Sequence, residues 1–215
     1  MDTNKISLNI LVLSTIAVIL IEIATRFAIS QDIFGPLTGL GLARFAQILA
    51  LVFISMRKEE GLASIGIERS KLLPGLVRGL CWSAGFGIAA GLIFLVLFFL
   101  GIDALKLFQT QLPINGGNII FFLGIGALLG PIAEEIFFRG IFYGYLRRWG
   151  IPAALIISTI FFVLPHSIDR GIPVTQIMGG LVFAVSYELE KNLVVPIVIH
   201  CLGNLAIFTL GILFT

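Results

Sequence analysis

Apolar segments long enough to cross a lipid bilayer recur along almost the whole chain. A helix needs roughly 20 apolar residues to span the hydrocarbon core, so these segments predict an all-α, polytopic transmembrane helical bundle of about seven spans. The fifth and sixth segments are short. The predicted spans are Ile6–Ile29, Pro36–Met56, Leu76–Leu100, Asn118–Leu146, Ile151–Pro165, Val174–Tyr187 and Leu193–Phe214.

The composition leads to the same conclusion about the surroundings of the protein. Hydrophobic residues make up 58% of the 215 residues and charged residues only 12%, whereas a soluble domain is about one quarter charged. Most of the surface is therefore expected to face the lipid bilayer. The net charge of +2 gives no basis for nucleic-acid binding. Several GxxxG pairs, among them Gly87/Gly91, Gly126/Gly130 and Gly140/Gly144, predict close helix packing.

The distribution of lysine and arginine predicts the orientation, because cytoplasmic loops carry an excess of both. If seven spans alternate, the N-terminal side receives most of these residues and the opposite side receives only Lys106 and Arg170. We therefore expect an integral protein of the plasma membrane with its N-terminus in the cytoplasm. The residues on the cytoplasmic side would be Lys5, Arg57, Lys58, Arg69, Lys71, Arg147, Arg148 and Lys191.

Two parts of the chain differ in how many polar residues their spans contain. Residues 1–117 hold the N-terminal transmembrane helices and a polar cytoplasmic loop, and residues 118–215 form the expected functional core. The first span contains Glu22 and Arg26 and is too long for the apolar region of a signal peptide, so we expect it to be retained. Cys81 and Cys201 are expected to be buried free thiols.

Ionisable side chains inside the apolar segments identify the candidate site, because each costs about 2.5–3.5 kcal/mol on insertion scales. In the fourth span, Glu135 and Arg139 are four residues apart, which is the spacing of an ion pair on one helix face. Glu134 is rotated by about 100° and has no such partner. Its carboxylate is therefore available as a general acid or base. The alternative is a single packing network of all three residues.

Two further clusters contain the only histidines of the chain. Phe162 and His166 share a helical face at the end of the fifth span, although a lone histidine there is more typical of a satisfied polar group and Pro165 could tilt its ring. His200 and Asn204 share a face of the seventh span, which favours binding of a substrate, a water molecule or another helix.

The three clusters together supply the groups that peptide hydrolysis needs. A carboxylate base, an imidazole that shares a proton and an amide donor can activate water and stabilise an oxyanion. Spacing alone does not show that the helices meet. We predict that Glu134, His166, His200 and Asn204 lie around one cavity.

The order of these clusters resembles the CPBP family, which comprises CAAX-protease and bacteriocin-processing intramembrane endopeptidases and proteins described as abortive-infection proteins. In that family EExxxR, FxxxH and HxxxN occur on successive core helices. Here they read EEIFFR (134–139), FVLPH (162–166) and HCLGN (200–204), and the resemblance covers roughly residues 118–210. It implies an intramembrane endopeptidase.

The resemblance also implies a role for each motif residue. Glu134 would activate the attacking water and His166 would share or orient it. His200 and Asn204 would stabilise the tetrahedral oxyanion.

The remaining motif residues would support the site, with Glu135 and Arg139 holding it together and Phe162 shaping the pocket. We expect no cofactor. The sequence has no HExxH motif, and zinc at Glu134, His166 and His200 is the less favoured option.

The implied substrate is a membrane-associated protein or peptide, such as a prenylated C-terminal tail, a bacteriocin leader or a C-terminal sorting tail. The main alternative is a catalytically silent member of the same family that acts as a membrane scaffold or immunity protein. A small proton-relaying transporter is a third possibility, but it would be expected to show an internal repeat, and the sequence has none.

Overall fold

The computed structural model describes residues 6–57, 60–102, 118–166 and 173–213, and within these ranges the chain forms helices and turns without a β-strand. All seven predicted segments are helical, so the predicted fold class is correct. Lys5, Lys58, Lys106 and Arg170 lie outside the described residues, as does most of the predicted loop 101–117.

Five of the helical segments are long and apolar enough to cross a membrane, and the predicted fifth and sixth spans are shorter. The segment Ile119–Trp149 is one continuous helix that includes α4, α5 and α6. The helices are α1 (Leu8–Ser30), α2 (Pro36–Met56), α3 (Leu72–Phe99), α4 (Ile119–Gly124), α5 (Gly130–Glu135), α6 (Gly144–Leu146), α7 (Ile151–Val163), α8 (Val174–Glu190) and α9 (Val194–Leu213).

The continuous helix Ile119–Trp149 is wound more loosely on both sides of the Glu134–Glu135 pair. Ile125–Leu129 and Ile136–Tyr143 have π-helical hydrogen bonding. Such widened turns are rare and occur frequently at functional sites. The two acids therefore lie on the short α-helical segment α5 between two irregular segments.

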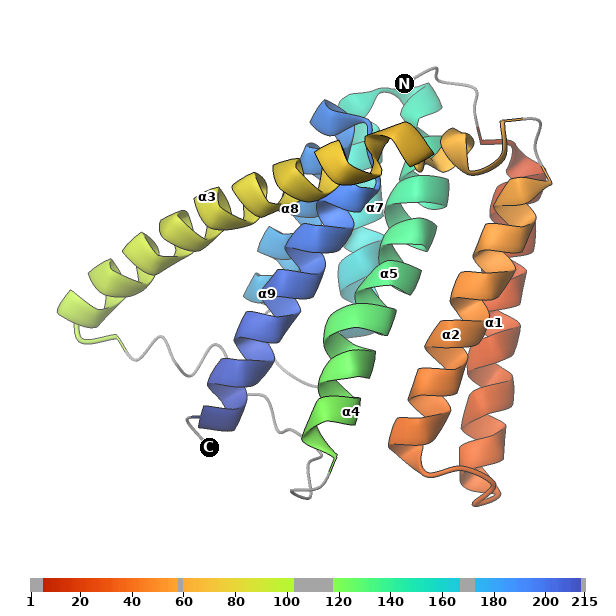
Figure 1. The fold of residues 1–215 in the computed structure, drawn as a ribbon, viewed down its shortest axis with the longest axis horizontal. Helices are drawn as coiled ribbons and strands as arrows, with labels where there is room; N and C mark the ends of the chain where they lie inside the picture. Colours follow the sequence, from red (N-terminus) through yellow and green to blue (C-terminus); the bar gives the residue numbers. More distant parts are fainter. Residues whose placement is uncertain (1–5, 58–59, 103–117, 167–172, 214–215) are drawn as a thin grey trace.

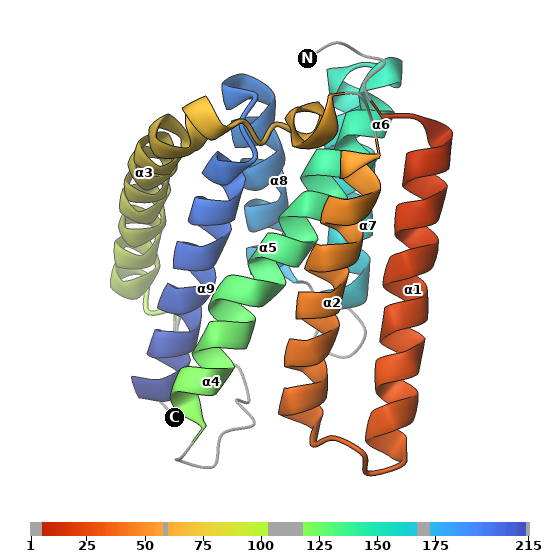
Figure 2. The ribbon, with the colours of Figure 1, turned by 45° about the vertical axis from the view of Figure 1, so that its right-hand side comes forward.

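Figure 1 shows how the helices are arranged around this continuous helix. α1 and α2 form an antiparallel hairpin on one side of it and α9 lies on the other side (Figures 1 and 2), while α7 and α8 lie behind these helices in the view of Figure 1. The two ends of the described chain lie at opposite ends of the bundle, as an odd number of passes requires. The segment after α2 and the turn between α8 and α9 lie at the same end as the N-terminus.

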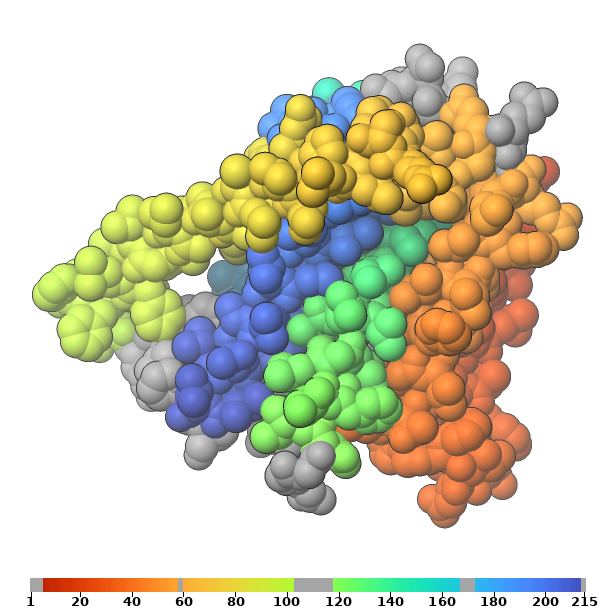
Figure 3. Space-filling view, in the orientation of Figure 1, coloured from red at the N-terminus to blue at the C-terminus, as the bar shows by residue number. Residues whose placement is uncertain are grey.

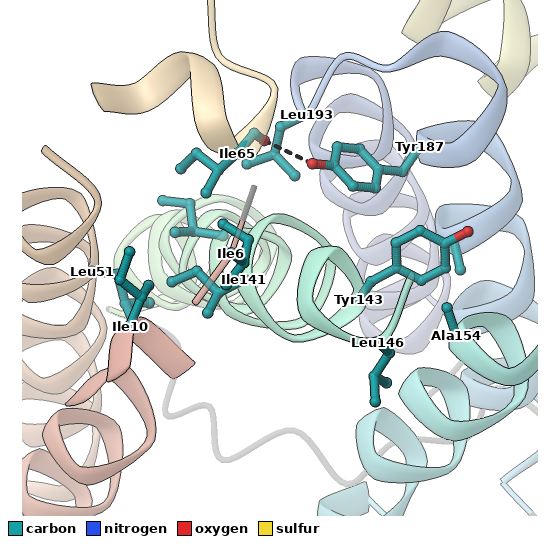
Figure 4. Packing of buried hydrophobic residues seen from close by; sticks show 12 residues of the cluster. Ile6, Ile10, Leu51, Ile65, Ile141, Tyr143, Leu146, Ala154, Tyr187 and Leu193 are labelled. Carbon is teal, nitrogen blue, oxygen red and sulfur yellow. Dashed lines mark hydrogen bonds between the residues drawn. The ribbon is translucent and has the colours of Figure 1, made fainter. Parts of the chain in front are cut away.

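A hydrophobic cluster at the N-terminal end of the bundle holds the helices together (Figure 4). The Tyr187 hydroxyl donates to the Ile65 carbonyl at 3.0 Å, and the Leu193 amide donates to the Gly66 carbonyl at 3.0 Å. Gly66 has a φ of 83°, and a Cβ atom there would lie 3.1 Å from the Tyr187 ring. Only glycine suits both the backbone conformation and this close approach.

An ionic cluster at the same end connects α8 to the continuous helix. Glu188 accepts hydrogen bonds from the Tyr143 hydroxyl at 2.7 Å and from Arg147 Nε at 2.8 Å, and it pairs with Lys191. This cluster was not among the predicted features. It fixes the end of α8 and therefore the start of α9.

α3 is packed against the bundle along only one half of its length. A Cβ atom at Gly79 would lie 2.7 Å from Val198 on α9, while Arg78 and Trp82 both bind the Glu190 carboxylate. The second half of α3 projects away from the bundle (Figures 1 and 3).

The glycines of the predicted GxxxG pairs also differ in how closely they pack. Gly126 packs against Phe208 on α9, as the spacing predicts, whereas Gly140 and Gly144 pack against Ile65 and Ile6, which lie outside the long helices. A Cβ atom at Gly87 or Gly91 would meet no neighbouring atom within 4 Å, so close packing is wrong for that pair in the part of the chain that the structure describes. Both cysteines are free, as predicted, but Cys81 on α3 is exposed and Cys201 is only partly buried.

Candidate active site

Glu135 and Arg139 form the buried ion pair that their spacing predicts. Arg139 Nη1 lies 3.1 Å from Glu135 Oε1, and both side chains are fully buried. Arg139 Nη2 also donates to the Gly180 carbonyl on α8 at 3.0 Å. The rings of Phe162 and Phe183 lie 4.3 and 5.3 Å from the guanidinium carbon. This cation is therefore stabilised by one carboxylate, one carbonyl and aromatic faces.

His200 on α9 contacts both acids. Its Nδ1 lies 2.8 Å from Glu135 Oε1, and its Nε2 lies 3.9 Å from Glu134 Oε2. Because Glu135 Oε1 already accepts from Arg139, we assign Nδ1 as the donor in the bond from His200. The Glu134 side chain is 20% exposed and that of Glu135 is fully buried. Glu134 is thus the more accessible of the two acids.

His166 follows α7 in a short 3-10 turn, Leu164–His166. Its Nδ1 lies 2.9 Å from the Phe162 carbonyl, and because a carbonyl can only accept, Nδ1 is the donor in this hydrogen bond. The ring centroids of Phe162 and His166 are 5.2 Å apart. Pro165 therefore does not disrupt the predicted shared face.

Asn204 lies one turn after His200 on α9 and contacts the continuous helix. Its amide nitrogen donates to the Gly126 carbonyl at 2.9 Å. Gly126 belongs to the π-helical segment Ile125–Leu129. The pair His200 and Asn204 thus faces the helix that carries Glu134.

The structure brings the three predicted clusters into one region of the bundle. Glu134 and Glu135 meet His200 directly, and Phe162 connects the two histidines because its ring lies 5.7 Å from that of His200. The contacts described for His166 are with Phe162. Within the described residues, no three His, Cys, Asp or Glu side chains are grouped as a metal site would require.

Comparisons with known proteins find similarity, and the matched family model covers the part of the chain that carries these residues. Residues 116–206 match the family model described as type II CAAX prenyl endopeptidase Rce1-like. The membrane-embedded CAAX protease MroQ of Staphylococcus aureus (strain USA300) is 34% identical over 109 residues, which are 47% of this chain and 41% of that protein. The match with the family model covers residues 116–206, which is less than half of the chain, so this segment is similar to CAAX proteases.

A second relative is also similar to part of the chain. YdiL of Bacillus subtilis (strain 168), a protein named as a candidate membrane peptidase, is 33% identical over 81 residues, which are 37% of this chain and 33% of YdiL. The chain thus matches less than half the length of each of these relatives. No solved structure matches the chain.

The match with the Rce1-like family model includes every predicted site residue, because the range 116–206 contains the continuous helix, α7, α8 and most of α9. α1, α2 and α3 lie outside it. Several residues that build the site were not predicted. Gly126, Gly180 and Phe183 contact predicted residues but are apolar and carry no ionisable group. Gly179 and Gly180 stand just before Phe183 in the sequence, and this glycine pair is the one feature that could have indicated close packing at this point.

Proposed function

We propose that this protein is an intramembrane endopeptidase that hydrolyses a peptide bond in a membrane-associated substrate. The observation that carries the proposal is the Glu134 carboxylate beside His200 Nε2, at 3.9 Å, while Glu135 holds the other ring nitrogen. One acid is thus available for chemistry, and the other is committed to orienting the histidine. The similarity of residues 116–206 to the family described as type II CAAX prenyl endopeptidase Rce1-like supports the same reaction class.

In the proposed reaction Glu134 accepts a proton from water as the water oxygen attacks the carbonyl carbon of the scissile bond. His166 is proposed to share or orient this water. The tetrahedral intermediate then breaks its C–N bond, and the proton held by Glu134 passes to the leaving nitrogen. General acid–base catalysis of this kind contributes about 10²–10⁴-fold in rate.

His200 and Asn204 are proposed to stabilise the oxyanion. Because Nδ1 of His200 already donates to Glu135, only a doubly protonated ring can donate from Nε2 as well. Glu134, Glu135, Arg139 and this imidazolium would form a site with two negative and two positive charges. A balanced set of charges suits a buried position inside a bilayer.

The substrate that we propose to test first is a prenylated C-terminal tail, since the matching family is described as a CAAX prenyl endopeptidase. A bacteriocin leader and a C-terminal sorting tail are the alternatives. We also propose that the protein lies in the plasma membrane with its N-terminus in the cytoplasm, and that it needs no cofactor.

The test compares cells that produce the wild type or Glu134→Gln at equal protein level. New peptide termini in the membrane fraction are identified by mass spectrometry, which requires no known substrate. We expect truncated tails with the wild type and none with Glu134→Gln. Glu68→Gln, which alters an exposed carboxylate paired with Lys71, is the matched control and should cleave normally. Cleavage by Glu134→Gln would overturn the proposal.

Complementation of a deletion phenotype separates the enzyme from the silent scaffold. An enzyme requires Glu134, so Glu134→Gln should fail to complement while Glu68→Gln succeeds. Complementation by Glu134→Gln would identify a scaffold or immunity protein instead.

Chelation tests the proposed independence from metal. If His200 and Asn204 hold the oxyanion, no Lewis acid is required. Activity of the purified protein should therefore survive exhaustive treatment with EDTA. Loss on chelation and recovery with zinc would replace this mechanism with a site of Glu134, His166 and His200.

A further inference from the structure

Phe183 on α8 lies face to face with the His200 imidazole. The ring centroids are 4.5 Å apart and the planes differ by 20°, which is within the range of aromatic stacking. Phe183 is nearly fully buried, at 7% exposure. The same ring borders the Arg139 guanidinium, at 5.3 Å. One phenylalanine outside the three motifs thus contacts two residues of the candidate site.

The sequence before Phe183 explains how its ring reaches this place. Gly179 lies one turn earlier, and a Cβ atom there would come within 3.2 Å of the Phe183 ring. Side chains on a helix lean toward the preceding turn, so the ring occupies the space that a side chain at position 179 would fill. A Cβ atom at Gly180 would lie 3.1 Å from both Phe162 and Thr159. The two glycines therefore permit the close packing of α8 against the site.

The hydrogen bond to Glu135 does not by itself fix the orientation of the imidazole. It sets the position of Nδ1 but leaves the ring free to rock about the line between Nδ1 and the carboxylate oxygen. Phe183 covers one face of the ring, and Phe162 meets it nearly edge-on, with planes 77° apart. Together the bond and the rings fix the plane of the imidazole and hence the direction of Nε2.

We propose that Phe183 is a positioning residue that holds His200 Nε2 beside the Glu134 carboxylate, and that Gly179 serves this role by leaving room for its ring. The proposal rests on the proposed function, because the direction of Nε2 matters for catalysis only if His200 stabilises the oxyanion. Phe183 and Gly179 both lie on α8, which contains none of the three motifs.

Kinetics with a cleaved peptide in proteoliposomes test this role. Phe183→Leu keeps an apolar side chain but removes the ring, so kcat should fall about three- to tenfold while KM stays within about twofold. Phe161→Leu makes the same change at a half-exposed ring that contacts Phe142 instead, and it should behave like the wild type. If kcat/KM falls only because KM rises, Phe183 contacts the substrate, and this result would overturn the proposal.

A double-mutant cycle tests whether Gly179 acts through Phe183. Gly179→Ala should displace the ring and lower kcat by an amount similar to that of Phe183→Leu. If the glycine acts only through the ring, the double variant should be no slower than Phe183→Leu alone. Additive losses would show that the two residues act independently and would contradict the role given to Gly179.

Nuclear magnetic resonance reports the position of His200 even if no substrate is found. The chain has two histidines, so histidine labelled in its ring gives two sets of signals. The ring current of Phe183 should shift the His200 signals, and Phe183→Leu should remove this shift while leaving His166 unchanged. Unchanged His200 signals in the folded variant would overturn the positioning role. If Phe183→Leu removes the shift but the wild-type protein shows no protease activity, the contact between Phe183 and His200 stands and the proposed function is rejected.

Discussion

One carboxylate oxygen, Glu135 Oε1, accepts hydrogen bonds from both Arg139 and His200. Within the described part of the chain, Glu135 Oε2 and Arg139 Nε have no hydrogen-bond partner. Glu135 is therefore the carboxylate that balances a fully buried guanidinium. Glu134 is partly exposed and has His200 as its neighbour. Removal of the Glu135 charge would therefore leave a buried cation without its counterion, and removal of the Glu134 charge would not.

This difference predicts opposite outcomes for two conservative variants. Glu135→Gln leaves the Arg139 cation buried without its counterion, and breaking such a pair costs about 3–5 kcal/mol of unfolding free energy. Glu134→Gln removes a partly exposed charge, so stability should change by less than about 1 kcal/mol while cleavage is lost. Thermal unfolding in detergent micelles, followed by circular dichroism, measures both. An equal loss of stability in the two variants would contradict the division of roles.

Asn204 offers a graded test of the oxyanion role. Loss of one oxyanion donor typically costs about 10²–10³ in kcat, so Asn204→Ala should be strongly impaired yet measurable. The lost bond to Gly126 should destabilise the fold by only about 1 kcal/mol. Kinetics at saturating substrate, corrected for the folded fraction, separate the two effects. A variant with normal kcat and reduced stability would make Asn204 a purely structural contact.

At the scale of single helices, the sequence predicted where the helices lie but not which faces pack. α2 was predicted with its observed bounds, because apolar length and the flanking Pro36 and Arg57 define both ends. The π-helical segments beside Glu134 and Glu135 have no such signal, since apolar residues occupy them as they do an ordinary helix. The sequence likewise did not predict that half of α3 projects from the bundle, because residues that face lipid and residues that face protein are equally hydrophobic.

α3 therefore gives a direct comparison between packed and unpacked glycines. Gly79→Ala places a methyl group 2.7 Å from Val198 Cβ, and such overpacking typically costs about 1–3 kcal/mol. Gly87→Ala meets no neighbouring atom within 4 Å and should be neutral or slightly stabilising, since alanine favours helix by about 0.5–1 kcal/mol over glycine. Thermal unfolding of both variants checks this. Equal destabilisation would mean that the distal half of α3 also packs closely.

At the scale of the whole molecule, the three motifs predicted which helices must meet. Polar residues are costly in lipid, so their positions indicate the interior of the bundle, and the contacts of His200 with Glu134 and Glu135 agree with this. The surrounding packing could not be predicted in the same way. Phe183 is one of 19 phenylalanines, and only the three-dimensional arrangement distinguishes it from the others. The Glu188 cluster was missed because its partners are distant in sequence.

The orientation of the bundle in the membrane is the remaining prediction at this scale. The polar segment after α2 should face the cytoplasm, and the turn after α1 should face the outside, because lysine and arginine concentrate at the former end. Ser64 lies in the polar segment after α2 but is unsuitable for labelling, since it is only 2% exposed. Ser70 and Ser30 are exposed positions at the two ends of the bundle. Each is replaced by cysteine in a Cys81→Ser, Cys201→Ser background.

A membrane-impermeant maleimide is then applied to intact cells and to opened cells. Ser30→Cys should react in intact cells, while Ser70→Cys should react only after the membrane is opened. The matched pair excludes a general failure of labelling, because each variant is the control for the other. Reaction of Ser70→Cys in intact cells, with Ser30→Cys protected, would reverse the orientation. In that case the Glu188 cluster and the start of α9 would lie on the outer side of the membrane.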